Sequence, residues 1–212
     1  MKRHLLRCWR RALPILASAG IFAPPVFTVG VILSSRLRIG YDPLQHGISE
    51  LALGPFGWLQ TTNFLVTGLL LVAFALGMFV ALEETLAVRA AVILLFLGGV
   101  GLLVLGLFPR DLPGSLPTLH GTIHNVAGNT LLGLPVACLA LGVAWQRDPY
   151  WRPYVAPSIG VGMLTLLLLP AYFYALRGGP LAPWTGLLQR LLVLGPLGWV
   201  EAVAIRLMRL VV

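Results

Sequence analysis

The sequence has few charged residues, no long polar segment and no internal repeat. Asp, Glu, Lys and Arg make up 10% of its 212 residues. No stretch between its apolar runs is large enough to form a soluble domain. The missing repeat of a three-helix unit argues against the repeat-built folds of many secondary transporters. Cysteine occurs only as Cys8, before the first apolar run, and Cys138, within the fourth, so we expect no disulfide between them.

Apolar residues are abundant and make up 58% of the chain. Six apolar stretches are long enough to cross a hydrocarbon core, which takes about 20 helical residues. Each stretch is continuously apolar instead of alternating every second residue, and this pattern indicates helices rather than a membrane barrel. We therefore predict an all-α integral membrane protein, a six-helix bundle that forms a single domain over residues 1–212. The expected helices cover residues 12–34, 58–82, 88–108, 120–145, 155–176 and 186–207.

The basic residues are distributed unevenly along this topology. An even number of helices puts both termini on one side, and placing them in the cytoplasm puts ten basic residues inside and five outside. This split obeys the positive-inside tendency, so we predict a multi-pass protein of the cell membrane with both termini cytoplasmic. The net charge of +8 then reflects topology and attraction to anionic lipid, and no soluble basic face exists for nucleic acid. The ten inner basic residues are Lys2, Arg3, Arg7, Arg10, Arg11, Arg89, Arg147, Arg152, Arg206 and Arg209.

The outer half of the fourth apolar run carries several polar side chains at membrane depth. Such groups are costly in lipid and must face protein or water. One interpretation is a buried hydrogen-bond network that fixes the outer end of the bundle. The residues that we assign to this polar cluster are Asp42, Asn63, His120, His124, Asn125 and Asn129.

The other interpretation of the two histidines is a metal site. His120 and His124 are four residues apart and share one face of a helix, which suits two ligands of one metal ion. A zinc site needs at least a third protein ligand. His46 and Asp111 are the main candidates, because their loops reach the same membrane level. Zinc is the cofactor that this pattern favours; a haem held by two histidines fits less well, because only His46 lies across from the fourth helix.

The segment between the first two helices, residues 36–57, holds Ser49 and Glu50 close to His46. Ser49 lies three residues from His46, but no oxyanion-stabilising site accompanies this pair. We expect Ser49 to cap a short helix that begins near Glu50, where an acidic side chain suits the helix dipole. If the protein is an enzyme, Ser49, Glu50 and Asp111 are its candidate catalytic residues.

Glu201 lies apart from these residues, in the inner third of the last apolar run. An acid within a membrane helix indicates proton or cation handling as a first hypothesis. The alternatives are a neutral or hydrogen-bonded carboxyl near Ser158 and a side chain that reaches the cytoplasmic surface.

Four short motifs together resemble the family known as domain of unknown function 998, whose members are membrane proteins of bacteria and archaea. The resemblance covers nearly the whole chain and implies a polytopic helical bundle of about this size, without an established activity. The matching motifs are Asp42-Pro43 with His46, Ser49-Glu50-Leu51, Phe108-Pro109 with Asp111, and His120 with His124.

A looser similarity is to the membrane hydrolases of the ceramidase and progestin-receptor-like superfamily. Those proteins place a serine, an aspartate and a histidine pair of this spacing around zinc. This chain differs from them in having six expected helices instead of seven, and in carrying its histidine pair in the middle of the sequence.

Three functions therefore remain open. Short loops, few charges and an incomplete catalytic set favour a non-enzymatic bundle that binds membrane lipids or serves as a subunit of a larger membrane complex. One alternative is a zinc-dependent hydrolase that uses His120 and His124 on a lipid at the outer leaflet. Another is a small-solute or proton-coupled transporter that uses Glu201.

Overall fold

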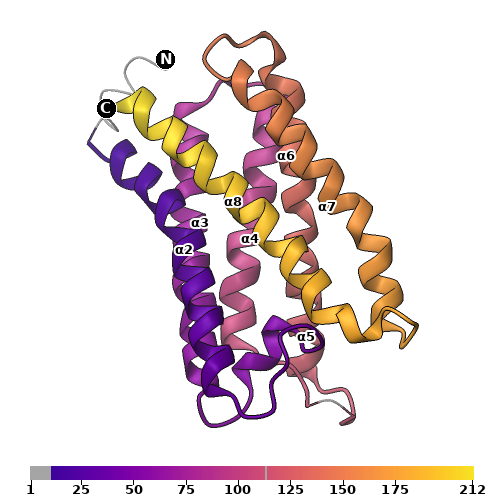
Figure 1. Ribbon diagram of the computed structural model, residues 1–212. Coiled ribbons are helices and arrows are strands. Elements are labelled where there is room, and N and C mark those ends of the chain that lie inside the picture. Colours follow the sequence, from indigo (N-terminus) through magenta and orange to yellow (C-terminus); the bar gives the residue numbers. More distant parts are fainter. Residues whose placement is uncertain (1–10, 113) are drawn as a thin grey trace.

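The computed structural model describes residues 11–112 and 114–212, and this part of the chain is helical without any β-strand. Six of its segments are long and apolar enough to cross a membrane, and they run together as a bundle (Figure 1). The predicted all-α, six-helix membrane fold is thereby confirmed. The long helices are α2 (Leu13–Leu37), α3 (Gly57–Ala81), α4 (Leu86–Leu107), α5 (Leu119–Asn129), α6 (Gly133–Ala144), α7 (Val155–Leu176) and α8 (Thr185–Val211). The short 3-10 helices are η1 (Ile48–Ala52), η2 (Thr130–Leu132), η3 (Trp145–Arg147), η4 (Arg152–Tyr154) and η5 (Ala182–Trp184).

The ends of the spans agree with the sequence prediction to within a few residues. The largest differences are at the ends of α2 and α8, which continue to Leu37 and Val211. Arg36 and Arg209 lie in the last turns of these two helices, where a cation suits the helix dipole. Several residues named in the sequence analysis lie outside the described part of the chain, namely Lys2, Arg3, Arg7, Cys8 and Arg10.

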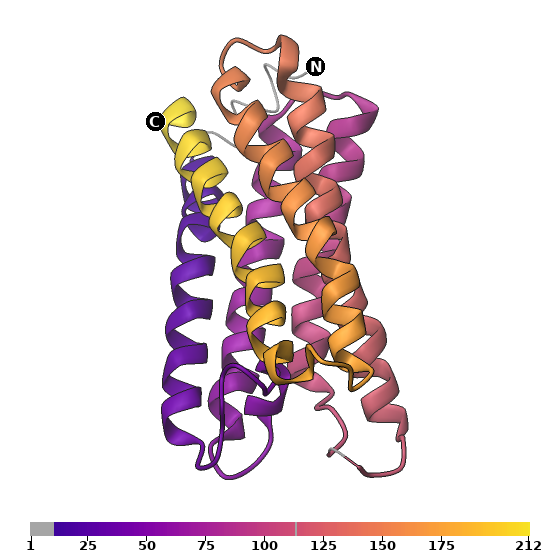
Figure 2. The same ribbon diagram turned by 45° about the vertical axis from the view of Figure 1, so that its right-hand side comes forward.

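The spans form a closed ring in the order of the sequence. α2 packs against α3, α3 against α4, α4 against α6, α6 against α7 and α7 against α8. The ring closes because α8 also packs against α2, and Figure 2 shows α8 (yellow) between α2 (indigo) and α7 (orange).

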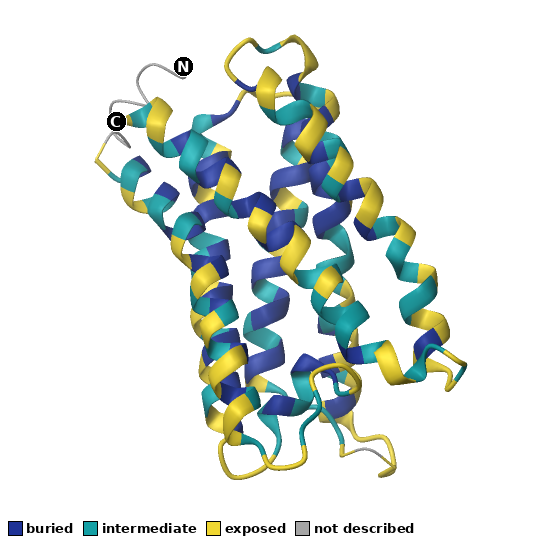
Figure 3. Ribbon diagram, in the orientation of Figure 1, coloured by how far each residue is buried: buried dark blue, intermediate teal, exposed yellow. Residues whose placement is uncertain are grey.

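Buried apolar side chains fill the interior of this ring. Buried residues follow the helix faces that meet, and exposed residues follow the faces that point outward (Figure 3). Large apolar side chains such as Leu164 and Leu167 of α7 are exposed on the outside, as expected where lipid surrounds the bundle. The largest fully buried side chains include Phe27, Leu71, Phe74, Leu95, Leu102, Leu141 and Val200.

The fourth span differs from its prediction as one continuous helix, because η2 separates α5 from α6. Pro135 lies in the first turn of α6 and has no N–H to donate to the carbonyl of Leu131, which removes one hydrogen bond across the junction. The three residues of η2 tighten into 3-10 geometry there. The apolar pattern of this span alone does not indicate the break.

The beginning of α2 and the end of α8 lie at the same end of the bundle (Figure 1). We call the opposite end the distal end. It comprises three connections, which are loop one (residues 38–56), loop two (residues 108–118) and the turn at residues 177–184. The candidate site lies at this end.

Candidate functional site

Loop one contains the short helix η1, which begins earlier than the sequence analysis expected. Gly47 is its N-cap residue, and the N–H of Gly47 donates to Oε1 of Glu50 at 2.9 Å. The predicted capping role of Ser49 is therefore wrong, because Ser49 lies inside η1. The prediction of an acidic side chain in the first turn is confirmed by Glu50.

Arg190, near the beginning of α8, holds loop one in place. The guanidinium of Arg190 donates to the carbonyls of Pro43 at 2.6 Å and His46 at 3.1 Å, and to the hydroxyl of Tyr41 at 2.6 Å. The Tyr41 hydroxyl in turn donates to the carbonyl of Gly47 at 3.0 Å. Burial raises the pKa of Tyr41, and the hydrogen bond from Arg190 acts in the opposite direction.

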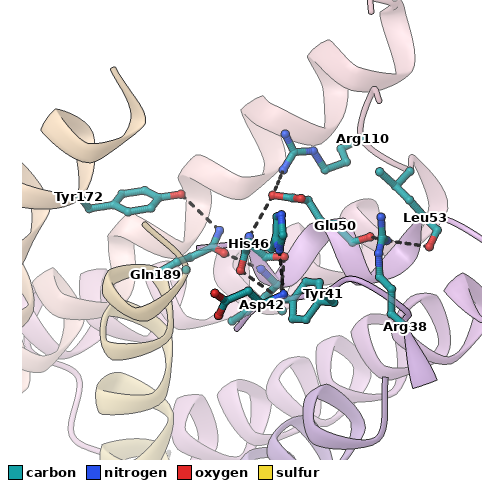
Figure 4. Close-up of polar contacts among 12 residues, drawn as sticks. Arg38, Tyr41, Asp42, His46, Glu50, Leu53, Arg110, Tyr172 and Gln189 are labelled. Atoms are coloured by element: carbon teal, nitrogen blue, oxygen red, sulfur yellow. Dashed lines mark hydrogen bonds and ion pairs between the residues drawn. The ribbon is translucent and has the colours of Figure 1, made fainter. Parts of the chain in front are cut away.

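Gln189 adds a second connection between α8 and η1 (Figure 4). Its Oε1 accepts from the N–H of Ile48 at 2.7 Å, and its Nε2 donates to the hydroxyl of Tyr172 on α7 at 3.3 Å. The sequence analysis missed the contributions of Gln189 and Arg190. Two adjacent polar residues near the start of an otherwise apolar span were a signal that could have found them.

Two further arginines fix Glu50 and the end of η1. Nη1 of Arg110 lies 3.4 Å from Oε1 of Glu50 and forms an ion pair. Arg38 donates to the carbonyl of Glu50 and, at 2.8 Å, to the carbonyl of Leu53 (Figure 4). As a result, η1 is attached to the end of α2, to loop two and to α8.

His46 and Asp42 take part in a local turn of loop one. The N–H of Asp42 donates to Nδ1 of His46 at 2.9 Å, so Nδ1 is occupied as an acceptor. The carboxylate of Asp42 accepts from the N–H of Leu44 at 2.8 Å and from the amide of Gln45 at 3.0 Å. These contacts stabilise the turn and do not reach α5.

Asp111 of loop two is bound to the residue that caps α5. Its carboxylate accepts from the hydroxyl of Thr118 at 2.6 Å and from the backbone N–H of Thr118 at 3.0 Å. These two hydrogen bonds lower the pKa of Asp111. Thr118 also accepts from the N–H of Gly121 at 3.1 Å, and a Cβ at Gly121 would overlap the carboxylate.

The two histidines of α5 have different environments. His124 is buried, and its Nδ1 lies 2.8 Å from the carbonyl oxygen of Phe108. Because a carbonyl can only accept, Nδ1 carries the proton and Nε2 is left as an acceptor. His120 is exposed, with its ring 5.3 Å from the ring of Phe108.

This geometry lacks the third ligand that a zinc site requires. Within residues 11–112 and 114–212, no three His, Cys, Asp or Glu side chains gather closely enough to hold a metal ion. Asp111 is engaged by Thr118, and His46 is engaged by loop one. We therefore derive no metal-dependent chemistry from His120 and His124.

A cavity of about 430 Å³ lies beside the buried histidine. All six spans and η1 contribute to its wall. Its polar end carries Ser49, Arg110, His124, Tyr172 and Gln189. Its apolar wall includes Phe27, Leu102, Leu105, Leu131, Leu169 and Val193.

The cavity is also bordered by exposed residues of α5 and α7. Asn125 and Asn129 on α5, and Phe173 and Leu176 on α7, line it and are exposed. α5 packs mainly against α4, whereas α7 packs against α6 and α8. The cavity therefore opens to the surroundings of the bundle between α5 and α7.

The residues assigned to one polar cluster occupy several separate places. Asp42 lies in its loop turn, and Asn125 and Asn129 line the cavity. Asn63 lies between α3 and α2, where its amide donates to the carbonyl of Phe27 at 3.0 Å. It also contacts two other residues of α3, Gln60 at 3.3 Å and Thr67 at 3.3 Å. The structure therefore contains several local sets of hydrogen bonds instead of one network.

Glu201 is partly exposed on α8, toward the end of the bundle that holds the termini. Its carboxyl group has no hydrogen bond or ion pair with another residue in the described part of the chain. Ser158 is not its partner, because the Ser158 hydroxyl accepts from Nε1 of Trp199 at 2.8 Å and donates to the carbonyl of Tyr154 at 2.6 Å. The hydrogen bond between Glu201 and Ser158 that one alternative involved is therefore not formed.

Comparison with known proteins agrees with the resemblance drawn from the motifs. No curated protein matches the chain, and no solved structure matches it. The model of one family, described as a protein of unknown function (DUF998), matches residues 21–206. This range includes four of the six membrane-spanning segments in full, most of the first and the last, and all residues of the cavity wall, so the chain belongs to the DUF998 family of membrane proteins.

Proposed function

We propose that the protein binds an amphiphilic lipid in the distal cavity and does not act on it chemically. The observation that carries this proposal is the cavity itself, with most of its polar groups toward the distal end and mainly apolar side chains along the rest of the wall. Its volume of about 430 Å³ falls in the range of about 300–1,000 Å³ that is common for small-molecule sites. Such a division suits a molecule with an apolar chain and a polar head.

The exposed asparagines of α5 support the same proposal. Amide side chains at membrane depth are expensive in contact with hydrocarbon alone. Asn125 and Asn129 have no hydrogen-bond partner among the described residues, and both line the cavity. A polar head group or associated water in the cavity would supply partners for these amides.

We also propose that the protein resides in the cell membrane with its termini in the cytoplasm. The excess of basic residues that the sequence assigns to the side of the termini supports this orientation. The distal cavity would then open toward the outer leaflet. Membrane lipids are the partners proposed for it, with other membrane subunits as further partners.

A substitution that fills the cavity tests lipid binding. Gly128 lines the cavity, and a Cβ at this position would meet only Leu105, at 3.9 Å. Gly128→Leu should therefore occupy the cavity without forcing the helices apart, and the purified protein should retain at least about fivefold less lipid because the side chain competes for the same space. Native mass spectrometry of the detergent-purified protein measures this retention.

Gly160→Leu is the matched control. Gly160 is an exposed residue of α7 with open space around it, and it does not line the cavity. This variant should retain as much lipid as the unaltered protein. Equal retention in the unaltered protein and in both variants would contradict lipid binding in the cavity.

A further inference from the structure

We propose that the polar end of the cavity recognises a phosphate-bearing, net anionic lipid head group through Arg110. This inference rests on the proposed function and specifies its ligand. The charge of the cavity wall favours an anion. Arg110 is the only Lys, Arg, Asp or Glu residue in the cavity wall formed by the described residues. A head group with a negative charge would therefore meet one fixed positive charge and no negative charge of the wall.

The guanidinium of Arg110 uses only part of its hydrogen-bonding capacity. Its one partner in the described chain is Glu50, and the distance of 3.4 Å from Nη1 to Oε1 is long for a charge-assisted hydrogen bond, which is usually about 2.7–2.9 Å. The guanidinium has five N–H donors, so most remain available. Its planar fork suits two oxygens of a phosphate.

Several hydrogen-bond donors in the same cavity wall as Arg110 have no acceptor within the described residues. Tyr172 accepts from Gln189 and has no acceptor for its own hydroxyl proton within the described residues. The hydroxyl of Ser49 and the amide of Asn125 also have no partner there, and both line the cavity. An anion with several acceptor oxygens would satisfy these donors, and Nε2 of His124 would accept from a hydroxyl of the head group.

Glu50 acts as a competitor for Arg110 in this arrangement. The N–H of Gly47 holds the Glu50 carboxylate at 2.9 Å, so Glu50 stays in place when Arg110 turns toward a ligand. Binding a phosphate would thus exchange a long ion pair for a bidentate contact. Removing the charge of Glu50 should strengthen anion binding, which distinguishes competition from simple structural support.

The experiment compares two lipids with identical chains on the full-length protein in detergent. Native mass spectrometry measures the ratio of bound dioleoyl phosphatidylglycerol, which is anionic, to bound dioleoyl phosphatidylcholine, which is zwitterionic, at equal concentrations. We expect a preference for the anionic lipid of about tenfold, since charge-assisted contacts are worth that much or more. Arg110→Gln should bring the ratio to about one while phosphatidylcholine is still bound, and Glu50→Gln should raise the ratio.

Arg177→Gln is the matched control, because Arg177 is an exposed basic residue of the distal end that does not line the cavity. It should leave the ratio unchanged. An equal loss of preference in Arg177→Gln, an unchanged ratio in Arg110→Gln, or a lower ratio in Glu50→Gln would overturn the inference. Displacement of phosphatidylglycerol by millimolar inorganic phosphate would also overturn it, because free phosphate would then be the ligand.

The variants distinguish a failure of the head-group assignment from a failure of lipid binding itself. If Gly128→Leu removes both lipids while Arg110→Gln changes no ratio, lipid binding stands and the head-group assignment fails. If Gly128→Leu removes neither lipid, both proposals fail.

Discussion

His124 illustrates how a polar side chain can be accommodated at membrane depth. Its Nδ1 proton is used by the carbonyl of Phe108, which ties loop two to α5, and its Nε2 is left as an acceptor beside the cavity. The spacing to His120 predicted one shared face, but only His124 is buried. A spacing of four residues puts two side chains on the same face of a helix. It does not determine which neighbouring segments cover each of them.

Asp111 gives a prediction at the scale of single residues. The hydrogen bonds from Thr118 lower the pKa of Asp111, so its carboxylate stabilises the folded state above its ordinary pKa of about 4. This contribution is lost as the pH falls through the lowered pKa. The unaltered protein should therefore unfold at a higher temperature than Asp111→Asn near pH 7, and the difference should vanish in strong acid.

Tryptophan fluorescence during heating in detergent measures both unfolding temperatures across this pH range. Glu83→Gln is a suitable control, because Glu83 is exposed and has no partner in the described part of the chain. It should unfold like the unaltered protein at neutral pH. A difference between the unaltered protein and Asp111→Asn that persists unchanged below pH of about 2 would show that the carboxylate charge is irrelevant.

The fourth span shows how an element can depart from its own apolar pattern. Its hydropathy predicts one helix, but η2 interrupts it between α5 and α6. Thr130 in η2 donates to the carbonyl of Ala127 at 2.7 Å, and α4 approaches closely at this point. Gly101 permits this approach, because a Cβ there would overlap the hydroxyl of Thr130 and lie 2.8 Å from the Ala127 carbonyl.

Gly101→Ala therefore tests the packing between these elements. The added methyl group should force α4 away from η2 and destabilise the fold by about 1–3 kcal/mol, as overpacking commonly does. Chemical unfolding in detergent measures the loss. Gly160→Ala adds the same group to open space on α7 and should be neutral or slightly stabilising. Equal stability of the two variants would show that α4 and η2 have room between them.

At the scale of the whole molecule, loop one and α8 connect the two ends of the sequence. Arg190 and Gln189 bind segments more than 140 positions earlier in the chain. These contacts lie where the ring closes between α2 and α8, and they position η1 over the polar end of the cavity. The cavity is therefore formed by the closed ring of helices and not by any one helix.

The orientation of the bundle gives the prediction at this scale. In a background in which Cys8 is replaced by Ser, a membrane-impermeant maleimide applied to intact cells should label Ser115→Cys in loop two. It should label Gln146→Cys, at the opposite end, only after the membrane is permeabilised. Both positions are exposed, and the native Cys138 is buried and should stay unlabelled. The reverse pattern would place the termini outside the cell.

The sequence alone was sufficient for the number, approximate limits and helical nature of the spans, because a bilayer demands long apolar segments with internally paired backbones. It also pointed to His124, Asn125 and Asn129, since polar groups stand out in such segments. The cavity, the break at η2 and the attachment of loop one to Arg190 required the tertiary structure. They depend on which helices meet and how closely, and contacts between residues far apart in the chain leave no periodic pattern in one sequence.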